Sequence, residues 1–259
     1  MYRFNYHKPD DMDAAQQLMA DAEDGVYLSG GMTLIPTLKA RLASPTDVID
    51  LSGLALSGIE LADDSLTIGA LTLHSEVAAG NEISSLSNLA LAIGDAQVRN
   101  RGTIGGSIAN SDPGADYPAA VMALGATINT TAGAIDADDF FQGLFETALQ
   151  PGAIVTSVTF PVPGRAAYEK FPNPASRYAV VGVMVAETNG DIRVGVTGAG
   201  PCAYRQLNFE QALADNFSVA ALDGLEVDYA EFNSDIHASA EYRGHLVGVM
   251  ARRAVAQIT

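Results

Sequence analysis

Two glycine-containing turns are the segments of this chain whose residue types best suit binding chemistry. The first is "YLSGGMT" (27–33), where a short apolar run leads through Ser29, Gly30 and Gly31 into a predicted helix start. Backbone N–H groups at such a junction have no helical partner, and the helix dipole adds positive potential there. The junction could therefore bind an anion without a basic side chain, although the same residues also make an ordinary tight turn.

The second turn is "GTIGG" (102–106), which lies in the polar stretch "VRNRGTIGGSIANSDPGADYP" (98–118). Gly105 and Gly106 permit a positive φ and leave no Cβ in the way of a flat or charged ligand. Hydroxyl, amide and carboxylate groups that suit a ribose or a diphosphate follow at Ser107, Asn110, Ser111 and Asp116, and two cations, Arg99 and Arg101, precede the turn. A long loop with Asx turns is the alternative, but two such turns in one domain favour a long ligand with a central diphosphate.

Other signatures of catalysis are missing from the sequence. "GVTGAG" (195–200) has the wrong spacing for a dinucleotide-binding fingerprint, and no phosphate loop or nucleophile elbow occurs. No histidine has metal-ligand spacing with a cysteine or carboxylate, and only His237 and His245 could share a helix face. We therefore predict no catalytic residue and no metal site. The single cysteine, Cys202, excludes an internal disulfide and an iron–sulfur cluster held by this chain alone.

Composition limits the class of protein. The chain has 259 residues, of which 48% are hydrophobic and 17% charged, and its formal net charge is −17. This charge argues against nucleic acid, whose phosphates need lysine and arginine, and it requires any phosphate ligand to be held by local dipoles and a few placed cations. No apolar run could span a bilayer and the N-terminus lacks a signal-peptide pattern, so we expect a cytoplasmic protein without a membrane span.

The elements that must position the two turns can be read from periodicity and turn signals. We expect helices over 11–22, from 32 or 33 to 41, in 73–80 and 86–96, and over 117–125, 136–145, 209–216 and 235–258. Strands are expected over 26–28, 46–51, 58–70 as a pair, 126–131, 152–163 and, joined by Asn189-Gly190, across 177–200. This pattern predicts an α+β fold with a first part over 1–163 and a second part, a small antiparallel sheet with helices, over 164–259.

Both turns and their surroundings resemble a known family. "SGGMTLIPTLKARLASPTDVIDL" (29–51) and "IGDAQVRNRGTIGGSIANSDPGADYPAAVMALGA" (93–126) are similar to the FAD-binding medium subunits of molybdenum hydroxylases, and the nearest type is that of aerobic carbon monoxide dehydrogenase. Xanthine dehydrogenase carries a similar domain. The resemblance continues through 138–161, 168–186 and 235–255, and so covers nearly the whole chain.

The resemblance implies a fold and its divisions. A two-part FAD-binding domain of the PCMH (vanillyl-alcohol oxidase-like) type would occupy 1–163, with a small βα subdomain over 1–55 and a larger α+β subdomain over 56–163. A C-terminal domain of an antiparallel sheet plus helices would follow over 164–259.

The resemblance also implies FAD contacts, residue by residue. The family's A-G-G-x-S motif, whose amides bind the FAD diphosphate, falls on residues 29–33, with Met32 where glutamine is common. Its T-I-G-G motif falls on 103–106. Further positions would lie near the diphosphate and ribose (Asn110, Asp116), the flavin or adenine (Ile93, Ile154, Val155), the isoalloxazine carbonyls (Lys170) and the flavin ring (Tyr178). The full set implied is Ser29, Gly30, Gly31, Met32, Thr33, Ile93, Thr103, Ile104, Gly105, Gly106, Asn110, Asp116, Ile154, Val155, Lys170 and Tyr178.

In such enzymes a large molybdopterin-binding subunit oxidises substrate, a small subunit carries two 2Fe-2S clusters, and the medium subunit's FAD passes electrons to an external acceptor. The resemblance thus implies an oxidoreductase subunit in a heterohexamer of two heterotrimers. Two alternatives stay open at this point. One is a self-contained FAD-dependent oxidase or dehydrogenase with its own substrate pocket. The other is an assembly subunit that keeps the fold without the flavin.

Overall fold

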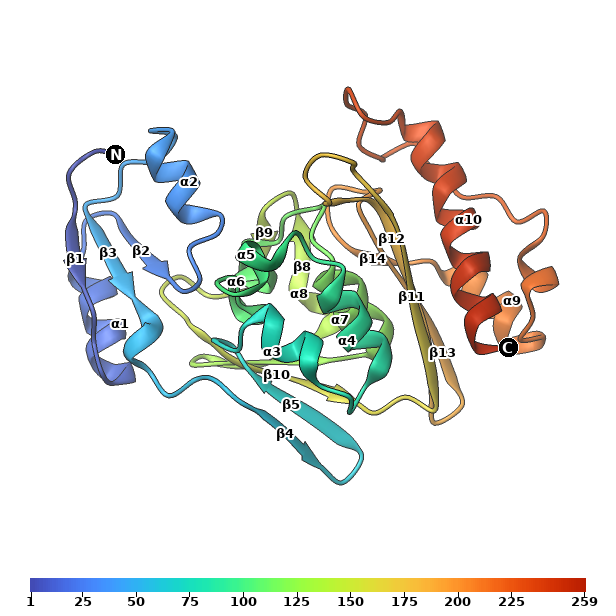
Figure 1. Cartoon of the computed structure of the whole chain (residues 1–259), viewed down its shortest axis with the longest axis horizontal. Helices are drawn as coiled ribbons and strands as arrows, with labels where there is room; N and C mark the ends of the chain where they lie inside the picture. Colours follow the sequence, from blue (N-terminus) through green and yellow to red (C-terminus); the bar gives the residue numbers. More distant parts are fainter.

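The computed structural model describes residues 1–259 and shows three parts in a row (Figure 1). The N-terminal part is a parallel sheet in the order β1-β3-β2, with two helices beside it. Its elements are β1 (Asn5–His7), α1 (Met12–Asp21), β2 (Gly25–Leu28), α2 (Leu34–Lys39), β3 (Asp47–Asp50) and the 3₁₀ turn η1 (Leu51–Gly53). The strand, turn and helix predicted around "YLSGGMT" are thus confirmed as β2, residues 29–33 and α2.

The central part is a five-stranded antiparallel sheet, in the order β4-β5-β10-β6-β7, beneath a group of short helices (Figure 1). A separate two-stranded ribbon, β8-β9, also belongs to this part. Its elements are β4 (Ile59–Ala62), β5 (Ser65–Gly69), α3 (His74–Ala79), α4 (Ser84–Leu91), α5 (Ala96–Arg99), α6 (Ile104–Asn110), α7 (Tyr117–Leu124), β6 (Thr127–Thr130), β7 (Gly133–Asp136), α8 (Ala137–Phe140), β8 (Phe141–Gly143), β9 (Glu146–Thr147) and β10 (Val155–Pro161).

The C-terminal part is an antiparallel sheet in the order β11-β12-β13-β14, and α9 and α10 lie on its outer side (Figure 1). Its elements are β11 (Arg165–Pro172), β12 (Ala179–Thr188), β13 (Asp191–Thr197), β14 (Tyr204–Arg205), α9 (Leu207–Asp215), the 3₁₀ turn η2 (Val219–Leu222) and α10 (Ala240–Ile258). The predicted hairpin at Asn189-Gly190 is confirmed, since both residues have positive φ, 53° and 85°, as a type I′ turn requires.

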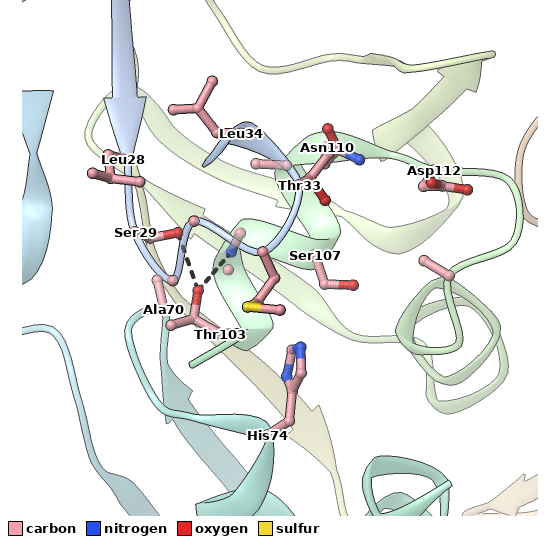
Figure 2. Close-up of a pocket in the computed structure, with 18 of the residues that line it drawn as sticks. Leu28, Ser29, Thr33, Leu34, Ala70, His74, Thr103, Ser107, Asn110 and Asp112 are labelled. Carbon is pink, nitrogen blue, oxygen red and sulfur yellow. Dashed lines mark hydrogen bonds between the residues drawn. The ribbon is translucent and has the colours of Figure 1, made fainter. Parts of the chain in front are cut away.

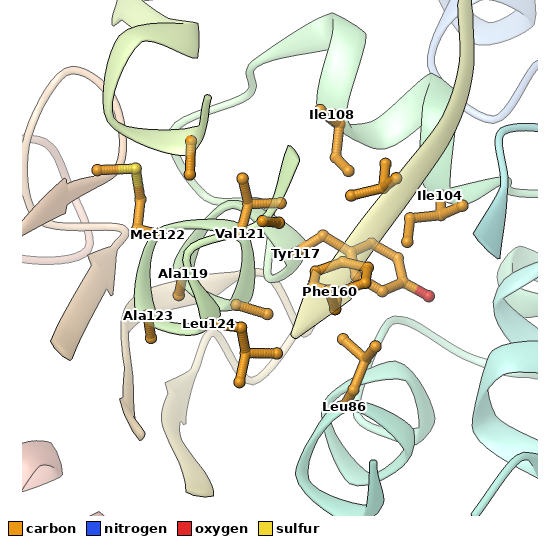
Figure 3. Packing of buried hydrophobic residues seen from close by; sticks show 14 of the residues in the cluster. Leu86, Ile104, Ile108, Tyr117, Ala119, Val121, Met122, Ala123, Leu124 and Phe160 are labelled. Carbon is orange, nitrogen blue, oxygen red and sulfur yellow. The ribbon is translucent and has the colours of Figure 1, made fainter. Parts of the chain in front are cut away.

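Strand β12 joins the central and C-terminal cores because its two faces are both covered. Met184 and Ala186 belong to the central core with α7, whereas Val181, Val183 and Val185 pack in the outer core with α10. The alternation of side chains along a strand produces this division, and burial on both faces explains the continuous apolar run "AVVGVMVA". The central core itself packs Tyr117, Phe160, Ile104 and Leu86 closely around α7 (Figure 3).

A network of ion pairs also joins these two parts. Asp138 of α8 accepts hydrogen bonds from Arg193 of β13 and from Arg205 of β14, and Arg205 also pairs with Glu210 of α9 at 2.7 Å. Glu210 is buried and additionally accepts a bond from the Val194 N–H. The network fixes the C-terminal sheet against the end of the central sheet.

Several sequence expectations differ from the structure. The stretch 98–118, interpreted as a glycine turn with a polar tail or alternatively as a long loop, contains the helix α6, because Thr103 caps it and Ile104 and Ile108 bury their side chains completely. The last helix begins at Ala240 rather than at 235, because Ser239 caps it. The helix expected over 136–145 ends at Phe140 and continues as β8. None of the helices has the length and apolar character needed to cross a membrane.

Candidate functional site

The turn between β2 and α2 carries a series of backbone N–H groups without partners. None of the N–H groups of residues 29–33 donates a hydrogen bond within the chain. Gly31 takes a left-handed conformation with φ +74°, and Thr33, the N-cap of α2, makes no side-chain capping bond. Successive free amides at a helix start form an anion-binding concavity. The prediction made from "SGGMT" therefore corresponds to an available set of donors.

The second turn is organised differently from the sequence expectation. Neither Gly105 nor Gly106 has a positive φ, and their amides are already used within the chain. Ile104 N–H donates to the Thr72 carbonyl at 3.1 Å, Gly105 N–H to the Ala70 carbonyl at 2.9 Å, and Gly106 N–H to Thr103 Oγ1 at 3.2 Å. The "TIGG" segment is therefore a rigid support and not a second set of free amides.

Glycine is needed in the support because backbone and side chains approach it closely. A Cβ on Gly105 would lie 2.5 Å from the Ala70 Cβ, and a Cβ on Gly106 would lie 2.6 Å from Ser29 Oγ. Real Cβ atoms show no contacts under 3.0 Å. The absent side chains thus make room for protein neighbours, where we had expected them to make room for a ligand.

The two turns form one unit. Thr103 Oγ1 donates to Ser29 Oγ at 3.2 Å, and the two side chains meet where the loops cross (Figure 2). A Cβ on Gly30 would lie only 2.0 Å from the Arg101 carbonyl oxygen. Because the loops touch backbone to backbone, the position of the free amides depends directly on the support beneath them.

A cavity of about 640 Å³ opens in front of this unit and is lined by all three parts of the fold. Its volume lies within the range of roughly 300–1,000 Å³ found for small-molecule and cofactor sites. Fourteen of the sixteen residues implied by the family resemblance line it: Ser29, Gly30, Gly31, Met32, Thr33, Ile93, Thr103, Gly105, Gly106, Asn110, Asp116, Ile154, Val155 and Tyr178. The structure thus brings together residues separated by up to 149 positions along the chain.

Two of the sixteen do not line the cavity. Ile104 is fully buried in the central core. The ammonium group of Lys170 lies 2.8 Å from an Asp116 carboxylate oxygen and donates to the carbonyls of Ala92 and Arg177, each at 2.9 Å. All three of its N–H donors are therefore used within the chain, and Lys170 lies behind the cavity wall instead of offering a free cation to a ligand.

Asp116 connects that buried lysine to the cavity. Its carboxylate also accepts a hydrogen bond of 2.6 Å from the Tyr168 hydroxyl. Burial raises the pKa of Asp116, whereas the Lys170 ammonium and the two hydrogen bonds act in the opposite direction. Direct contact with the ammonium favours the carboxylate form. The hydroxyl of Tyr168 in turn has its pKa raised well above the ordinary value by burial and by Asp116, so it stays a donor.

Polar side chains in the lining remain free to bind. Ser107 and Asn110 make no side-chain hydrogen bond within the chain and face the cavity from α6 (Figure 2). Arg177, which the sequence analysis did not select, also lines the cavity, and its Nη1 donates to the Gly94 carbonyl at 3.2 Å. The guanidinium of Arg99 is bound to the carbonyls of Ile93 and Gly94. Neither Arg99 nor Arg101 lines the cavity. The nearby positive charge therefore comes from Arg177.

His74 is a second lining residue that sequence reasoning missed. It begins α3, and burial together with the charge of Arg99 lowers its pKa from 6.5 to about 4. The imidazole is therefore neutral at physiological pH. No motif surrounds it in the sequence, so only the path of the chain reveals its place in the cavity.

The lining as a whole suits a long ligand with an anionic centre. Free amides and hydroxyl and amide side chains provide donors, and the apolar lining includes Leu28, Leu34, Ile93 and Ile154. Figure 2 shows Leu28 and Leu34 on one side of the crossing loops and His74 on the other. A diphosphate at the amides with a flat ring system along the apolar walls would satisfy both kinds of surface.

Comparison with known proteins supports this ligand. Residues 2–163 match the family model described as the FAD binding domain in molybdopterin dehydrogenase, and residues 166–258 match the model described as the CO dehydrogenase flavoprotein C-terminal domain. FAD is accordingly the cofactor of this fold, and the mixed helix and sheet architecture agrees with the predicted class.

Two curated relatives and one solved structure show the extent of the similarity. The carbon monoxide dehydrogenase medium chain of Afipia carboxidovorans is 35% identical, over 97% of this chain and 95% of its own. The glyceraldehyde dehydrogenase medium chain of Sulfolobus acidocaldarius is 31% identical, over 98% of each chain. The structure of carbon monoxide dehydrogenase from Hydrogenophaga pseudoflava matches with a TM-score of 0.88 and 31% identity, over 99% of each chain.

Proposed function

Because this chain belongs to the family of FAD-binding medium subunits of molybdenum hydroxylase-type dehydrogenases, we propose that it carries electrons from 2Fe-2S clusters of a partner subunit to an external acceptor. The observation that carries the proposal is the row of unpartnered amides over residues 29–33, which line a cofactor-sized cavity. When bound, FAD supplies the redox chemistry, and the protein supplies binding, orientation and electrostatics.

The hydrogen-bond donors that line the cavity fit the polar groups of FAD. Amides of residues 29–33 would hold the diphosphate, and charge-assisted bonds of this kind contribute roughly 1.5–3 kcal/mol each. Ser107 and Asn110 would reach the neighbouring sugar or ribityl hydroxyls from α6. In a protein with net charge −17, such neutral donors hold an anion where the overall field would repel it.

The apolar lining residues would orient the rings. Ile93 follows α4 and Tyr178 precedes β12, and both line the cavity together with Ile154 and Val155 at the start of β10. Asp116 would face the cofactor while Lys170 and Tyr168 hold its carboxylate from behind. We therefore assign Lys170 a positioning role through Asp116, in place of direct contact with the flavin.

The partners follow from the family and from the cysteine count. A single cysteine does not hold a 2Fe-2S cluster, so the electron donor belongs to another chain. We propose a small 2Fe-2S subunit and a large molybdopterin-binding subunit, assembled as a heterohexamer of two heterotrimers in the cytoplasm. Relatives named for carbon monoxide, 6-hydroxypseudooxynicotine and glyceraldehyde dehydrogenases share this fold, so the large subunit would select the substrate.

The proposal is tested by cofactor titration followed by electron transfer. The full chain is titrated with FAD, and quenching of flavin fluorescence should saturate at one FAD per chain. The complex purified with its partner subunits should then reduce the bound flavin when its substrate is added. A chain that binds no FAD, alone or in the complex, would refute the function. Flavin reduction by a small organic substrate with the chain alone would favour a self-contained oxidase or dehydrogenase instead.

A further inference from the structure

His74 has two ring nitrogens without a hydrogen-bond partner inside the cavity wall. The residue is buried, with 5% exposure, and its backbone N–H is fixed by a 2.9 Å bond to the Gly102 carbonyl. Neither ring nitrogen bonds to the protein, and Nδ1 is fully enclosed. A buried polar atom without a partner costs roughly 1–3 kcal/mol, so a partner for this ring is to be expected.

Tyr117, whose ring lies beside that of His74, has a hydroxyl that could donate the missing hydrogen bond. Its ring centroid lies 5.3 Å from that of His74, with the planes tilted by 51°. The Tyr117 hydroxyl is also fully enclosed and also lacks a partner, and burial keeps it protonated by raising its pKa. A hydroxyl donor and an imidazole acceptor, both without a partner, thus lie in neighbouring rings.

That pairing determines which nitrogen carries the proton. If the Tyr117 hydroxyl donates toward Nδ1, the neutral imidazole must hold its single hydrogen on Nε2. Nε2 lies against the backbone of Gly102, where a Cβ would come within 2.5 Å of it, but unlike Nδ1 it is not fully enclosed. Because His74 lines the cavity, Nε2 is the ring nitrogen that a ligand could reach. Figure 2 shows the imidazole of His74 projecting from α3 toward Thr103, the N-cap of α6, and toward Ser107 on α6.

We infer that His74 is a cofactor-binding residue that presents a neutral Nε2–H donor to an acceptor atom of the bound FAD, and that Tyr117 positions it by fixing this tautomer. The inference rests on the proposed function, since it names a further contact in the same site. A neutral donor suits this place for the same reason as the amides: it binds an acceptor without adding a buried charge.

Nuclear magnetic resonance on histidine-labelled protein tests the tautomer directly. The chain has only four histidines, His7, His74, His237 and His245, so the signals of His74 are identified by their loss in His74→Gln. Long-range ¹H–¹⁵N spectra of the wild type should show the Nε2–H tautomer, and the Nε2 signal should shift when FAD is added. In Tyr117→Phe the tautomer preference should weaken. A Nδ1–H tautomer, or a signal indifferent to FAD, would overturn the inference.

Cofactor titration of three full-length variants gives an independent reading. His74→Leu removes one donor and should weaken FAD binding about tenfold, whereas His74→Gln keeps a donor and should stay within about threefold of wild type. Wild-type affinity in His74→Leu refutes the contact while leaving the proposed function intact. Failure of the wild type itself to bind FAD refutes the proposed function. If His74→Leu does not fold, the wild-type spectra and His74→Gln still decide the question.

Discussion

Replacing Gly30 by alanine separates the two turns and tests whether their contact creates the FAD site. A Cβ at this position would lie 2.0 Å from the Arg101 carbonyl oxygen and 2.8 Å from the Gly102 Cα. Contacts of real Cβ atoms begin at 3.0 Å, so the loops must part by about 1 Å. The obstacle is backbone on both sides, and no flexible side chain is present to yield.

A displacement of this size is large enough to break a hydrogen bond. Bonds of about 2.9 Å between amide and phosphate oxygen weaken steeply when they lengthen by about 1 Å. If two of the amide bonds are lost, at roughly 1.5–3 kcal/mol each, FAD affinity falls by about 3–6 kcal/mol. This corresponds to a rise of roughly 10²–10⁴-fold in Kd.

The assay compares FAD affinity with stability, using Gly164→Ala as the matched control. Gly164 lies in the turn between β10 and β11, has no positive φ, and offers 3.7 Å to the nearest atom for a new Cβ. Both variants should keep the wild-type circular dichroism spectrum, and Gly164→Ala should keep its FAD affinity. Gly30→Ala with FAD affinity within threefold of wild type would refute the claim that loop contact positions the amides.

Three further predictions concern the surroundings of the site. Lys170→Met leaves the buried Asp116 carboxylate without its cation and should lower the free energy of unfolding by about 3–5 kcal/mol. In urea denaturation the double variant Lys170→Met/Asp116→Asn should lose less stability than Lys170→Met alone, and an equal or larger loss would contradict the pairing. The pKa of His74 is lowered from 6.5 to about 4, so between these two pH values only the unfolded state binds the proton. From pH 6.5 to pH 5 the free energy of unfolding of the wild type should therefore fall by about 1.5 kcal/mol more than that of His74→Gln. Parallel curves of stability against pH for the two proteins would disprove the shift. Asp138→Ala removes a half-exposed carboxylate between two arginines and should lower the stability measured by thermal unfolding at low salt by about 1 kcal/mol or less. High salt should reduce this difference, and a loss above about 3 kcal/mol would show that the network is effectively buried.

The elements with local signals could be predicted from the sequence. The hairpin at Asn189-Gly190 formed because these two residues accept positive φ, and α7 formed because an apolar run follows a proline suited to a first helical turn. The unit "YLSGGMT" likewise combined a strand, a glycine turn and a helix start. In each case the residues that specify the structure lie within a few positions of one another.

The helix α6 was missed because its stabilisation is tertiary. The segment "IGGSIAN" contains residues with weak helix propensity, and its helix has only seven residues. It forms because Ile104 and Ile108, four apart, are both completely buried and Thr103 caps the first turn. Because α6 packs into the core in this way, Gly105 leaves room for the neighbouring Ala70 and not, as the sequence suggested, for a ligand.

The side chains behind the cavity were beyond sequence reasoning for a different reason. Family position placed Lys170 near the flavin, but its surroundings depend on the carbonyls of Ala92 and Arg177, which lie far away in sequence or in an irregular loop. His74 has no flanking motif, and its unpartnered nitrogens become visible only when Tyr117 and Gly102 are placed beside it. Such information resides in long-range packing.

The two turns, so similar in composition, therefore have unlike tasks. Residues 29–33 offer free amides because nothing in the chain satisfies them, which leaves the loop short of stabilising bonds of its own. Residues 104–106 donate their amide N–H groups to Thr72, Ala70 and Thr103, and so gain the rigidity that the first turn lacks. Binding an anion with amides alone requires donors held in place before the ligand arrives. The close contact at Gly30, where a Cβ would lie 2.0 Å from the Arg101 carbonyl oxygen, transmits that rigidity from one turn to the other.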